Sequence, residues 1–163
     1  MMIIPNKEVH IGLTETTDTK VTEIATKPGI AENLTEKWTY PDGMPENLTF
    51  EIRQNEKIIG QTAFKSFRWF NRKAELSLFL HPDFQNKGLG TSILKSMINH
   101  AFCQLNLHRL EAEVNEYNLP AMKMMEKLGF VKEGVLREAR FLNGKYYNII
   151  RFGLLYNEFE KEN

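Results

Sequence analysis

Gln85-Asn86-Lys87-Gly88-Leu89-Gly90-Thr91 joins an apolar run, Leu76-Ser77-Leu78-Phe79-Leu80, to a strongly amphipathic helical pattern. Glycines let several backbone N–H groups converge on one point without a Cβ in the way, and a helix that starts here adds its unpaired N-terminal donors. The stretch is therefore typical of a phosphate-binding loop. It lacks the Gly-Lys-Ser/Thr of a Walker loop, and Ile93 stands where a dinucleotide fingerprint needs a third glycine.

A second informative segment follows after one more helix and one more strand. It contains Asn115-Glu116-Tyr117-Asn118-Leu119-Pro120-Ala121, then Met125-Glu126-Lys127-Leu128-Gly129-Phe130, and then Glu133-Gly134-Val135-Leu136-Arg137. Together with the loop, this order resembles the GNAT N-acetyltransferases, whose pyrophosphate loop reads Gln/Arg-x-x-Gly-x-Gly/Ala after an Ala-Glu-Leu-x-Leu strand. The closing Glu-Gly-x-Leu-Arg and Asn-Gly-Lys-Tyr-Tyr are most similar to the ribosomal-protein N-terminal acetyltransferase branch. The resemblance covers about residues 48–156.

The residue periodicity predicts a mixed, mostly antiparallel sheet. Three alternating runs at 48–53, 58–64 and 74–80, with short connections, favour an antiparallel meander. A helix over 88–104 and a strand over 109–114 predict a right-handed parallel crossover. A second helix, capped by Asn118 and ended by Gly129, precedes two runs that the hairpin signal Asn143-Gly144 joins.

We therefore expect an α/β (α+β) fold with a central sheet of about six to seven strands, flanked by helices, with a β-α-β crossover at the cofactor site. The resemblance implies the same architecture. Before this core, residues 8–13 predict a first strand and residues 14–34 predict one or two short helices.

Length and composition limit the classes of protein that fit. A chain of 163 residues is expected to form a single domain over 1–163. Lysine plus arginine equals aspartate plus glutamate at 21 each, so no basic surface indicates a nucleic-acid partner. With no signal peptide and no apolar run long enough to cross a membrane, we expect a cytoplasmic protein. The single cysteine, Cys103, is expected to be a buried, inert thiol.

The resemblance implies acetyl-CoA as cosubstrate. The strands of the family splay apart after the Ala-Glu-Leu sequence, which leaves main-chain donors for the thioester and the pantetheine. The residues expected to contact the cosubstrate are Leu78, Phe79, Leu80, Gln85, Asn86, Lys87, Gly88, Leu89, Gly90, Thr91, Asn115, Asn118, Ala121 and Lys127. Lys87 and Arg137 are candidates for phosphate charge. The alternative is structural: Leu78–Leu80 as strand core, Asn118 as a helix cap and both cations as exposed side chains.

Acetyl transfer to an amine needs a proton acceptor, because only a neutral amine attacks a thioester carbon. Lysine-type amines have a pKa of about 10.4 and α-amines of about 7.7 to 8.0, so both are largely protonated near neutral pH. Glu75 opens the strand before the loop and, by strand alternation, points away from Ala74 and Leu76. The resemblance implies that Glu75 is the catalytic base, directly or through water. A solvated or salt-bridged strand glutamate is the alternative.

The general acid is not identified. Many members of the family carry a tyrosine at the position of Met125, where it protonates the leaving thiolate, although the ribosomal branch often lacks it. Tyr117, Tyr146 and Tyr147 are nearby alternatives, each of which also fits an ordinary core or surface role. No cluster of His, Cys and carboxylate residues has the spacing of a metal site, so we expect no metal.

These features predict an enzyme that transfers the acetyl group of acetyl-CoA to a primary amine by direct attack in a ternary complex. The acceptor is either a peptide or protein N-terminus or a small molecule. The alternative is a catalytically silent acyl-CoA-binding module that regulates a partner, and Met125 keeps it open. Residues Thr14–Leu48, which overhang the acceptor site in the family, carry no readable pattern, so the acceptor stays unidentified. The resemblance also allows a homodimer.

Overall fold

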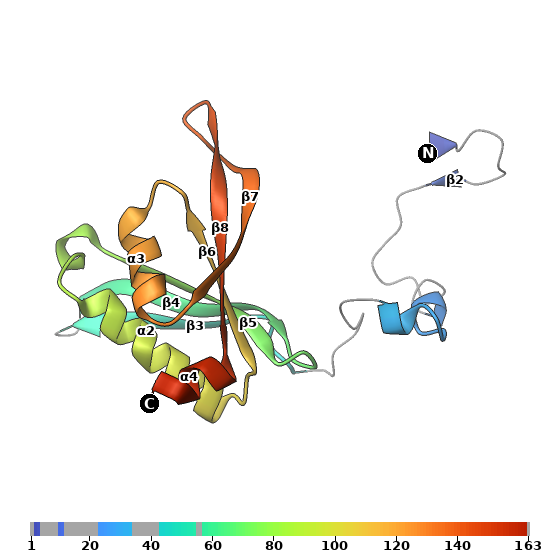
Figure 1. Cartoon of the computed structure of the whole chain (residues 1–163), viewed down its shortest axis with the longest axis horizontal. Coiled ribbons are helices and arrows are strands. Elements are labelled where there is room, and N and C mark those ends of the chain that lie inside the picture. Colours follow the sequence, from blue (N-terminus) through green and yellow to red (C-terminus); the bar gives the residue numbers. More distant parts are fainter. Residues whose placement is uncertain (1, 4–9, 12–22, 34–42, 55–56, 163) are drawn as a thin grey trace. The chain divides into compact units, whose positions relative to one another are not determined.

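The computed structural model describes residues 2–3, 10–11, 23–33, 43–54 and 57–162. By their contacts, the residues divide into two compact units, Met1–Gly43 and Met44–Asn163, and each is described by itself. Figure 1 labels the elements of both. The expectation of one domain over residues 1–163 stays a prediction.

The first unit contains short elements in its described part. β1 (Met2–Ile3) pairs antiparallel with β2 (His10–Ile11), residues 23–25 are helical, and η1 (Ala31–Asn33) is a short 3-10 helix. These elements agree with the strand predicted at 8–13 and the short helices predicted at 14–34. The remainder of both predicted ranges lies outside the described residues.

The second unit is built on a six-stranded sheet in the order β3-β4-β5-β6-β8-β7. Its strands are β3 (Leu48–Gln54), β4 (Lys57–Arg68), β5 (Lys73–Leu80), β6 (Arg109–Asn115), β7 (Val131–Leu142) and β8 (Lys145–Leu155). Only β5 and β6 pair parallel among these neighbours; the other pairs are antiparallel. The predicted mixed, mostly antiparallel sheet is confirmed, as is the Asn143-Gly144 turn, where both residues have positive φ.

The parallel pair β5–β6 is short. It is formed by Lys73 with Arg109, Ala74 with Leu110 and Glu75 with Glu111, and it ends there. β5 continues to Leu80 beside β4, and β6 continues to Asn115 beside β8. The two strands therefore separate toward their carboxyl ends. The chain between them forms η2 (Pro82–Phe84), α2 (Leu89–Asn99) and the π-helical segment η3 (His100–Gln104).

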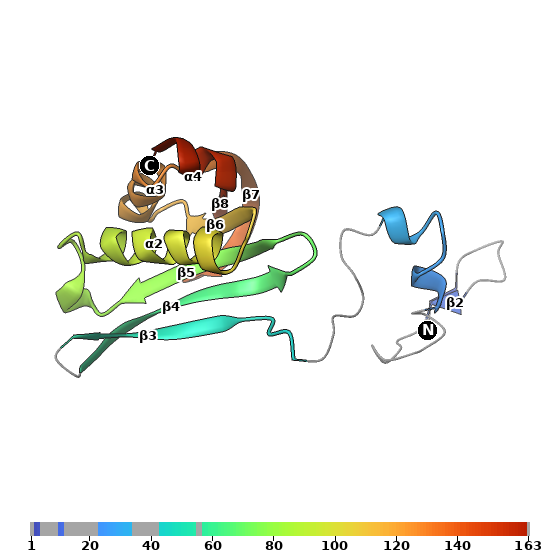
Figure 2. The ribbon, with the colours of Figure 1, turned by 90° about the horizontal axis from the view of Figure 1, so that it is seen from below.

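Helices α2, α3 (Leu119–Lys127) and α4 (Tyr156–Glu162) lie on one face of the sheet (Figure 2). The strand side chains that alternate toward this face are buried with the helices in one apolar cluster. Its largest fully buried members are Phe64, Phe67, Leu94, Leu110, Phe152 and Leu154. Burial of such side chains is the main favourable contribution to folding, at about 1.5 to 3 kcal/mol each.

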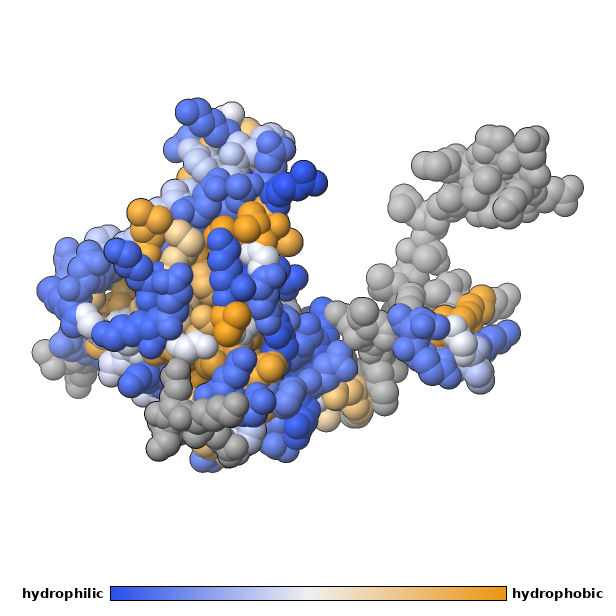
Figure 3. Space-filling model, in the orientation of Figure 1, coloured by the Kyte–Doolittle hydropathy of each residue, from blue (hydrophilic) through white to orange (hydrophobic). Residues whose placement is uncertain are grey.

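The opposite face of the central strands is polar. On β5 and β6 it carries Lys73, Glu75, Arg109, Glu111 and Glu113, which alternate with the buried residues. Figure 3, which has the orientation of Figure 1 and so shows the helix side of this unit, has a mostly hydrophilic surface with apolar residues gathered in patches. The same two strands therefore supply core residues on one face and charged groups on the other.

Some elements differ from the sequence expectation. The helix predicted at 88–104 begins at Leu89, and its last turn is π-helical from His100. β4 extends to Arg68, beyond the predicted range of 58–64. The expectation of a buried thiol at Cys103 is wrong: this cysteine is exposed, because it lies on the solvent side of the last turn.

The residue periodicity does not predict α4. Its start depends on contacts that form only in the folded chain: Leu155 N donates to Glu158 Oε2 at 2.8 Å, and Tyr156 N donates to His108 O at 2.9 Å. A helix therefore follows β8 directly, without a separate capping residue in the sequence.

Candidate functional site

A cavity of about 370 Å³ lies where β5, the loop after it, the start of α2 and the start of α3 meet. Its lining consists of Leu78, Phe79, Leu80, Gln85, Asn86, Gly88, Gly90, Thr91, Asn118, Pro120, Ala121 and Met124. The two sequence segments that predicted a cofactor site are thus brought together, although about 25 residues separate them in the chain.

The loop presents backbone donors to this cavity. Asn86 and Gly88 have positive φ values of 58° and 77°, and Gly88 is the N-cap of α2. Ser92 N donates to Gly88 O at 3.2 Å, so the N–H groups of Leu89, Gly90 and Thr91 precede the first helical hydrogen bond. Unpaired N–H groups and the positive end of the helix dipole make this helix start a favourable place for an anion.

Two loop side chains hold the loop itself. Gln85 Nε2 donates to Leu80 O at 2.8 Å, which ties the loop to the end of β5. Lys87 Nζ donates to Asp83 O at 2.7 Å and lies 5.9 Å from the centre of the Phe84 ring. Gln85, the first residue of the loop motif, therefore makes a structural contact that the sequence did not predict.

A second cavity of about 230 Å³ lies where β5 and β6 separate. It shares Leu78, Asn118, Ala121 and Met124 with the first cavity, so the two adjoin. Its other lining residues are Glu75, Leu76, Ser77, Leu94, Ala112, Glu113, Val114, Asn115 and Met125. The predicted base and the residue at the family's tyrosine position thus line the same space.

Glu75 is half-buried among charges of both signs. Burial is the largest influence and raises the pKa of its carboxyl group, and the charge of Glu113 raises it further. Lys65 and Arg151 act in the opposite direction, Glu111 raises the pKa again, and the net pKa lies above its ordinary value. Among the described residues, the Glu75 carboxylate has no hydrogen-bond or ion-pair partner. A carboxylate in this state is suited to accept a proton.

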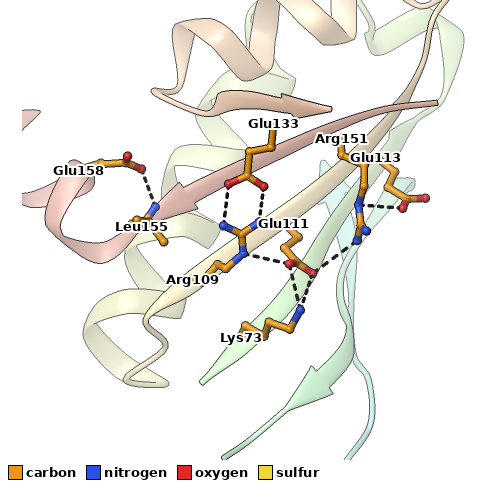
Figure 4. Close-up of polar contacts among 8 residues, drawn as sticks. All are labelled: Lys73, Arg109, Glu111, Glu113, Glu133, Arg151, Leu155 and Glu158. Carbon is orange, nitrogen blue, oxygen red and sulfur yellow. Dashed lines mark hydrogen bonds and ion pairs between the residues drawn. The ribbon is translucent and has the colours of Figure 1, made fainter. Parts of the chain in front are cut away.

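Arg109 lies on the polar face between the carboxylates of Glu111, on the same strand β6, and of Glu133 on β7 (Figure 4). Its Nη1 and Nη2 atoms donate to the two oxygens of Glu133, and its Nε donates to Glu111 at 2.9 Å. Lys73 Nζ also donates to Glu111, at 3.0 Å. Burial alone would raise the pKa of Glu111, but the hydrogen bonds from Arg109 and Lys73 outweigh it and hold that pKa below its ordinary value.

Gly153 on β8 makes room for this arrangement. A Cβ at this position would lie 2.3 Å from Glu133 Oε1, closer than real Cβ contacts come. Because Gly153 is the pairing partner of both Glu111 and Val131, the Glu133 side chain passes over it to reach Arg109. The ion pair of Glu133 with Arg109 therefore uses the space that Gly153 leaves, and no sequence motif marks this glycine.

Most predicted site residues line one of the two cavities. Lys87, Leu89, Lys127 and Arg137 line neither, while Pro120 and Met124 line the first cavity and were missed by the sequence. A proline after a capping asparagine and a methionine on the buried side of α3 look like ordinary helix features, so no sequence signal marked them. Asn118 caps α3 as predicted, since its Oδ1 accepts a hydrogen bond from Ala121 N at 3.2 Å.

The described residues contain neither a candidate metal site nor a candidate membrane-spanning helix. Within the described part of the chain, no group of three or more His, Cys, Asp or Glu side chains is arranged to hold a metal ion. In the same residues, no helix has the length and apolar character needed to cross a membrane.

Known proteins match both the sequence and the fold. The family described as acetyltransferase (GNAT) domain matches residues 11–150. The chain is 30% identical over 111 residues to the spermidine N(1)-acetyltransferase of Vibrio cholerae, which covers 68% of this chain and 64% of that protein. It is 29% identical over 105 residues to the putative ribosomal N-acetyltransferase YdaF of Bacillus subtilis, which covers 64% of this chain and 57% of that protein.

A solved structure is also similar. The dodecameric structure of spermidine N-acetyltransferase from Vibrio cholerae has a TM-score of 0.69 and 27% identity, and the match covers 72% of this chain and 70% of that chain. The chain spans between 50% and 66% of the length of the first curated relatives that it matches. Because the family match extends over most of the sequence and the fold agrees, this chain belongs to the GNAT acetyltransferase family.

Proposed function

We propose that this protein transfers the acetyl group of acetyl-CoA to the primary amine of a small molecule, with both substrates bound at once. The observation that carries the proposal is the pair of adjoining cavities, one beside the Gly88 loop and the other containing Glu75. Transfer from a phosphate-bearing thioester needs an anion site and a proton acceptor within reach of each other. The pair of cavities offers both.

The residues of the first cavity fit the donor. Backbone N–H groups at the start of α2 suit a pyrophosphate. Its oxygens accept several hydrogen bonds at once, so a group of donors serves it better than a single cation. Gly90 lines this cavity without a side chain, and a Cβ there would already be in van der Waals contact with Met124 Sδ at 3.4 Å and with Leu78 Cδ2 at 3.5 Å, so a larger side chain would take up cavity space. The apolar lining beyond it, including Pro120 and Ala121, suits the thin pantetheine arm.

In this proposal Glu75 accepts the amine proton, directly or through water, as the nitrogen bonds to the thioester carbon. The main chain at Phe79 donates a hydrogen bond to the oxyanion that forms, since β5 has no β6 partner beyond Glu75. The C–S bond then breaks and the sulfur leaves with the electron pair. Since a free thiol has a pKa of about 8.5, a proton from solvent is sufficient to complete the step without the tyrosine that Met125 replaces.

The acceptor is proposed to be a small amine rather than a peptide. Support comes from the similarity to proteins named spermidine N-acetyltransferases. A second argument is local: Glu111 and Glu113 are paired with cations, whereas Glu75 has no partner among the described residues. An ammonium group approaching the second cavity thus meets one carboxylate that no hydrogen bond or ion pair from the described residues occupies.

The decisive experiment is to measure release of free coenzyme A from acetyl-CoA with a panel of acceptors: spermidine, other polyamines, amino sugars and peptides with free N-termini. We expect saturable release with at least one small amine. Release with peptides only would contradict the proposed acceptor class while retaining the transfer reaction. Calorimetry of acetyl-CoA binding, run beside it, shows whether the donor site is intact in the same preparation.

The second candidate is a silent acyl-CoA-binding module, which Met125 favours because it cannot donate a proton. This candidate requires acetyl-CoA binding with no coenzyme A release for any amine, at any pH where the chain stays folded. The same two measurements therefore separate it from the enzyme.

A further inference from the structure

Glu75 and Glu113 lie on opposite sides of the opening between β5 and β6. Glu111 is the last β6 residue paired with β5, opposite Glu75. Glu113 is two residues further on, so strand alternation puts it on the same polar face. Both glutamates line the second cavity. The sequence alone gives no reason to connect them, because 38 positions separate them.

Arg151 holds Glu113 in place. The two residues are direct partners in the antiparallel β6–β8 pair, and Arg151 Nε lies 3.4 Å from Glu113 Oε1. Arg151 Nη2 also lies 3.8 Å from Glu111 Oε2 (Figure 4). Glu113 is therefore an acidic side chain oriented by Arg151 beside the cavity, whereas Glu75 has no hydrogen-bond or ion-pair partner among the described residues.

The charges that face Glu75 come from three strands. β4 contributes Lys65, which is the pairing partner of Glu75, β6 contributes Glu111 and Glu113, and β8 contributes Arg151. The two β6 carboxylates raise the pKa of Glu75, and the two cations lower it. After burial, Glu113 has the largest effect. Because Glu111 is already bound by Lys73 and Arg109, Glu113 is the acidic neighbour that a single substitution can remove with least disturbance.

We propose that Glu113 is a positioning residue of the Glu75 base: it fixes negative charge across the cavity and so determines how strongly Glu75 takes a proton from the acceptor amine. Arg151 limits this effect by compensating part of the charge. The inference rests on the proposed role of Glu75. It adds that the strength of the base is set from β6 and β8, by the pair of Glu113 and Arg151.

The test compares Glu113→Gln with Arg151→Gln in the full chain. The first removes a negative neighbour and the second removes a positive one, so the Glu75 titration should move to lower pH in Glu113→Gln and to higher pH in Arg151→Gln. NMR titration of the Glu75 side-chain carboxyl carbon, in protein labelled at glutamate, measures the pH at which Glu75 titrates. This measurement needs no acceptor amine. The acidic limb of the pH profile of kcat/KM should move in the same two directions.

Controls separate an electrostatic role from a structural one. Arg151→Lys keeps the positive charge and should restore the wild-type titration. Glu51→Gln removes one negative charge from the edge strand β3, where Glu51 pairs with Arg53, and should leave the titration unchanged. In Glu113→Gln, Arg151 retains Glu111, so the polar face keeps its fold. Thermal unfolding of each variant verifies this.

The outcomes are distinguishable. If Glu75 titrates alike in wild type, Glu113→Gln and Arg151→Gln, or if both variants move it in one direction, the inference is wrong. Opposite movements in the NMR titration support it even when no amine in the panel releases coenzyme A. In that last case only the proposed function fails.

Discussion

The two ends of the β5–β6 pair differ sharply, although the same two strands form both. At the first end, three residue pairs join the strands, and Glu111 accepts hydrogen bonds from both Lys73 and Arg109 on the polar face. At the second end the strands separate, no cross-strand bond joins them, and two adjoining cavities take their place. Glu75 lies at the boundary. The comparison shows that the candidate site lies where the parallel β5–β6 pairing ends. The paired segment next to it is held together by hydrogen bonds to Glu111.

The largest effect is expected at the boundary itself. Glu75→Gln should lower kcat by about 100-fold or more, because general base catalysis contributes about 10²- to 10⁴-fold. The dissociation constant of acetyl-CoA should stay unchanged, since Glu75 does not line the first cavity. Steady-state kinetics and calorimetry check both. Unchanged kcat would remove Glu75 from the mechanism.

The same substitution also tests the sign of the Glu75 titration. Its pKa is raised in the folded chain, so the ionised form is less favourable there than in the unfolded chain. Stability is therefore lost as pH rises from the ordinary glutamate pKa through the raised one. Glu75→Gln, which carries no charge, should not reduce the free energy of unfolding at pH 7.

The paired end of β5 and β6 is tested by the substitution Glu111→Gln. This change removes the negative charge that Lys73 and Arg109 share, together with one of its two acceptor oxygens, and should lower the free energy of unfolding by about 2 kcal/mol at pH 7. The pKa of Glu111 is lowered by folding, so its contribution is present above the ordinary glutamate pKa and is lost as pH falls through the lowered value. Urea unfolding should show the gap between variant and wild type narrowing in acid. A gap that widens in acid would contradict this account.

The smallest effect is expected in the first cavity. Gly90→Val should weaken acetyl-CoA binding by about tenfold, because the new side chain would fill space between Met124 and Leu78 that a ligand needs, at a cost of about 1.4 kcal/mol. Gly134→Ala on β7 is the matched control, as its Cβ would meet nothing within 4 Å. Calorimetry with both variants checks the difference. Equal affinities would mean that this cavity does not hold the donor.

Sequence periodicity predicted the strands and the Gly88 loop, but not the ion pairs near Glu75. The strands, the hairpin and the Gly88 loop follow from alternation and glycine positions, which are local properties of the chain. The ion pairs of Arg109 with Glu133 and of Arg151 with Glu113 depend on the register of β6 against β8 and β7. Register between distant strands is not a local property, so the groups that surround Glu75 could not be predicted.

Helix α4 and Cys103 are missed for a related reason. The helix begins on a hydrogen bond from Tyr156 N to His108 O, which joins residues far apart in the sequence. The exposure of Cys103 depends on the direction of the last, π-helical turn, where the helical period changes. The first feature depends on a contact between distant residues and the second on a change of helical period, and local sequence periodicity predicts neither.

Asn118 divides one amide group between two tasks. Its oxygen accepts a hydrogen bond from Ala121 N and holds the start of α3, and the residue lines both cavities. Serine, threonine or aspartate would cap the helix about as well, but none of them would leave an N–H donor behind. A substitution at Asn118 would therefore alter the start of α3 and the lining of both cavities at the same time.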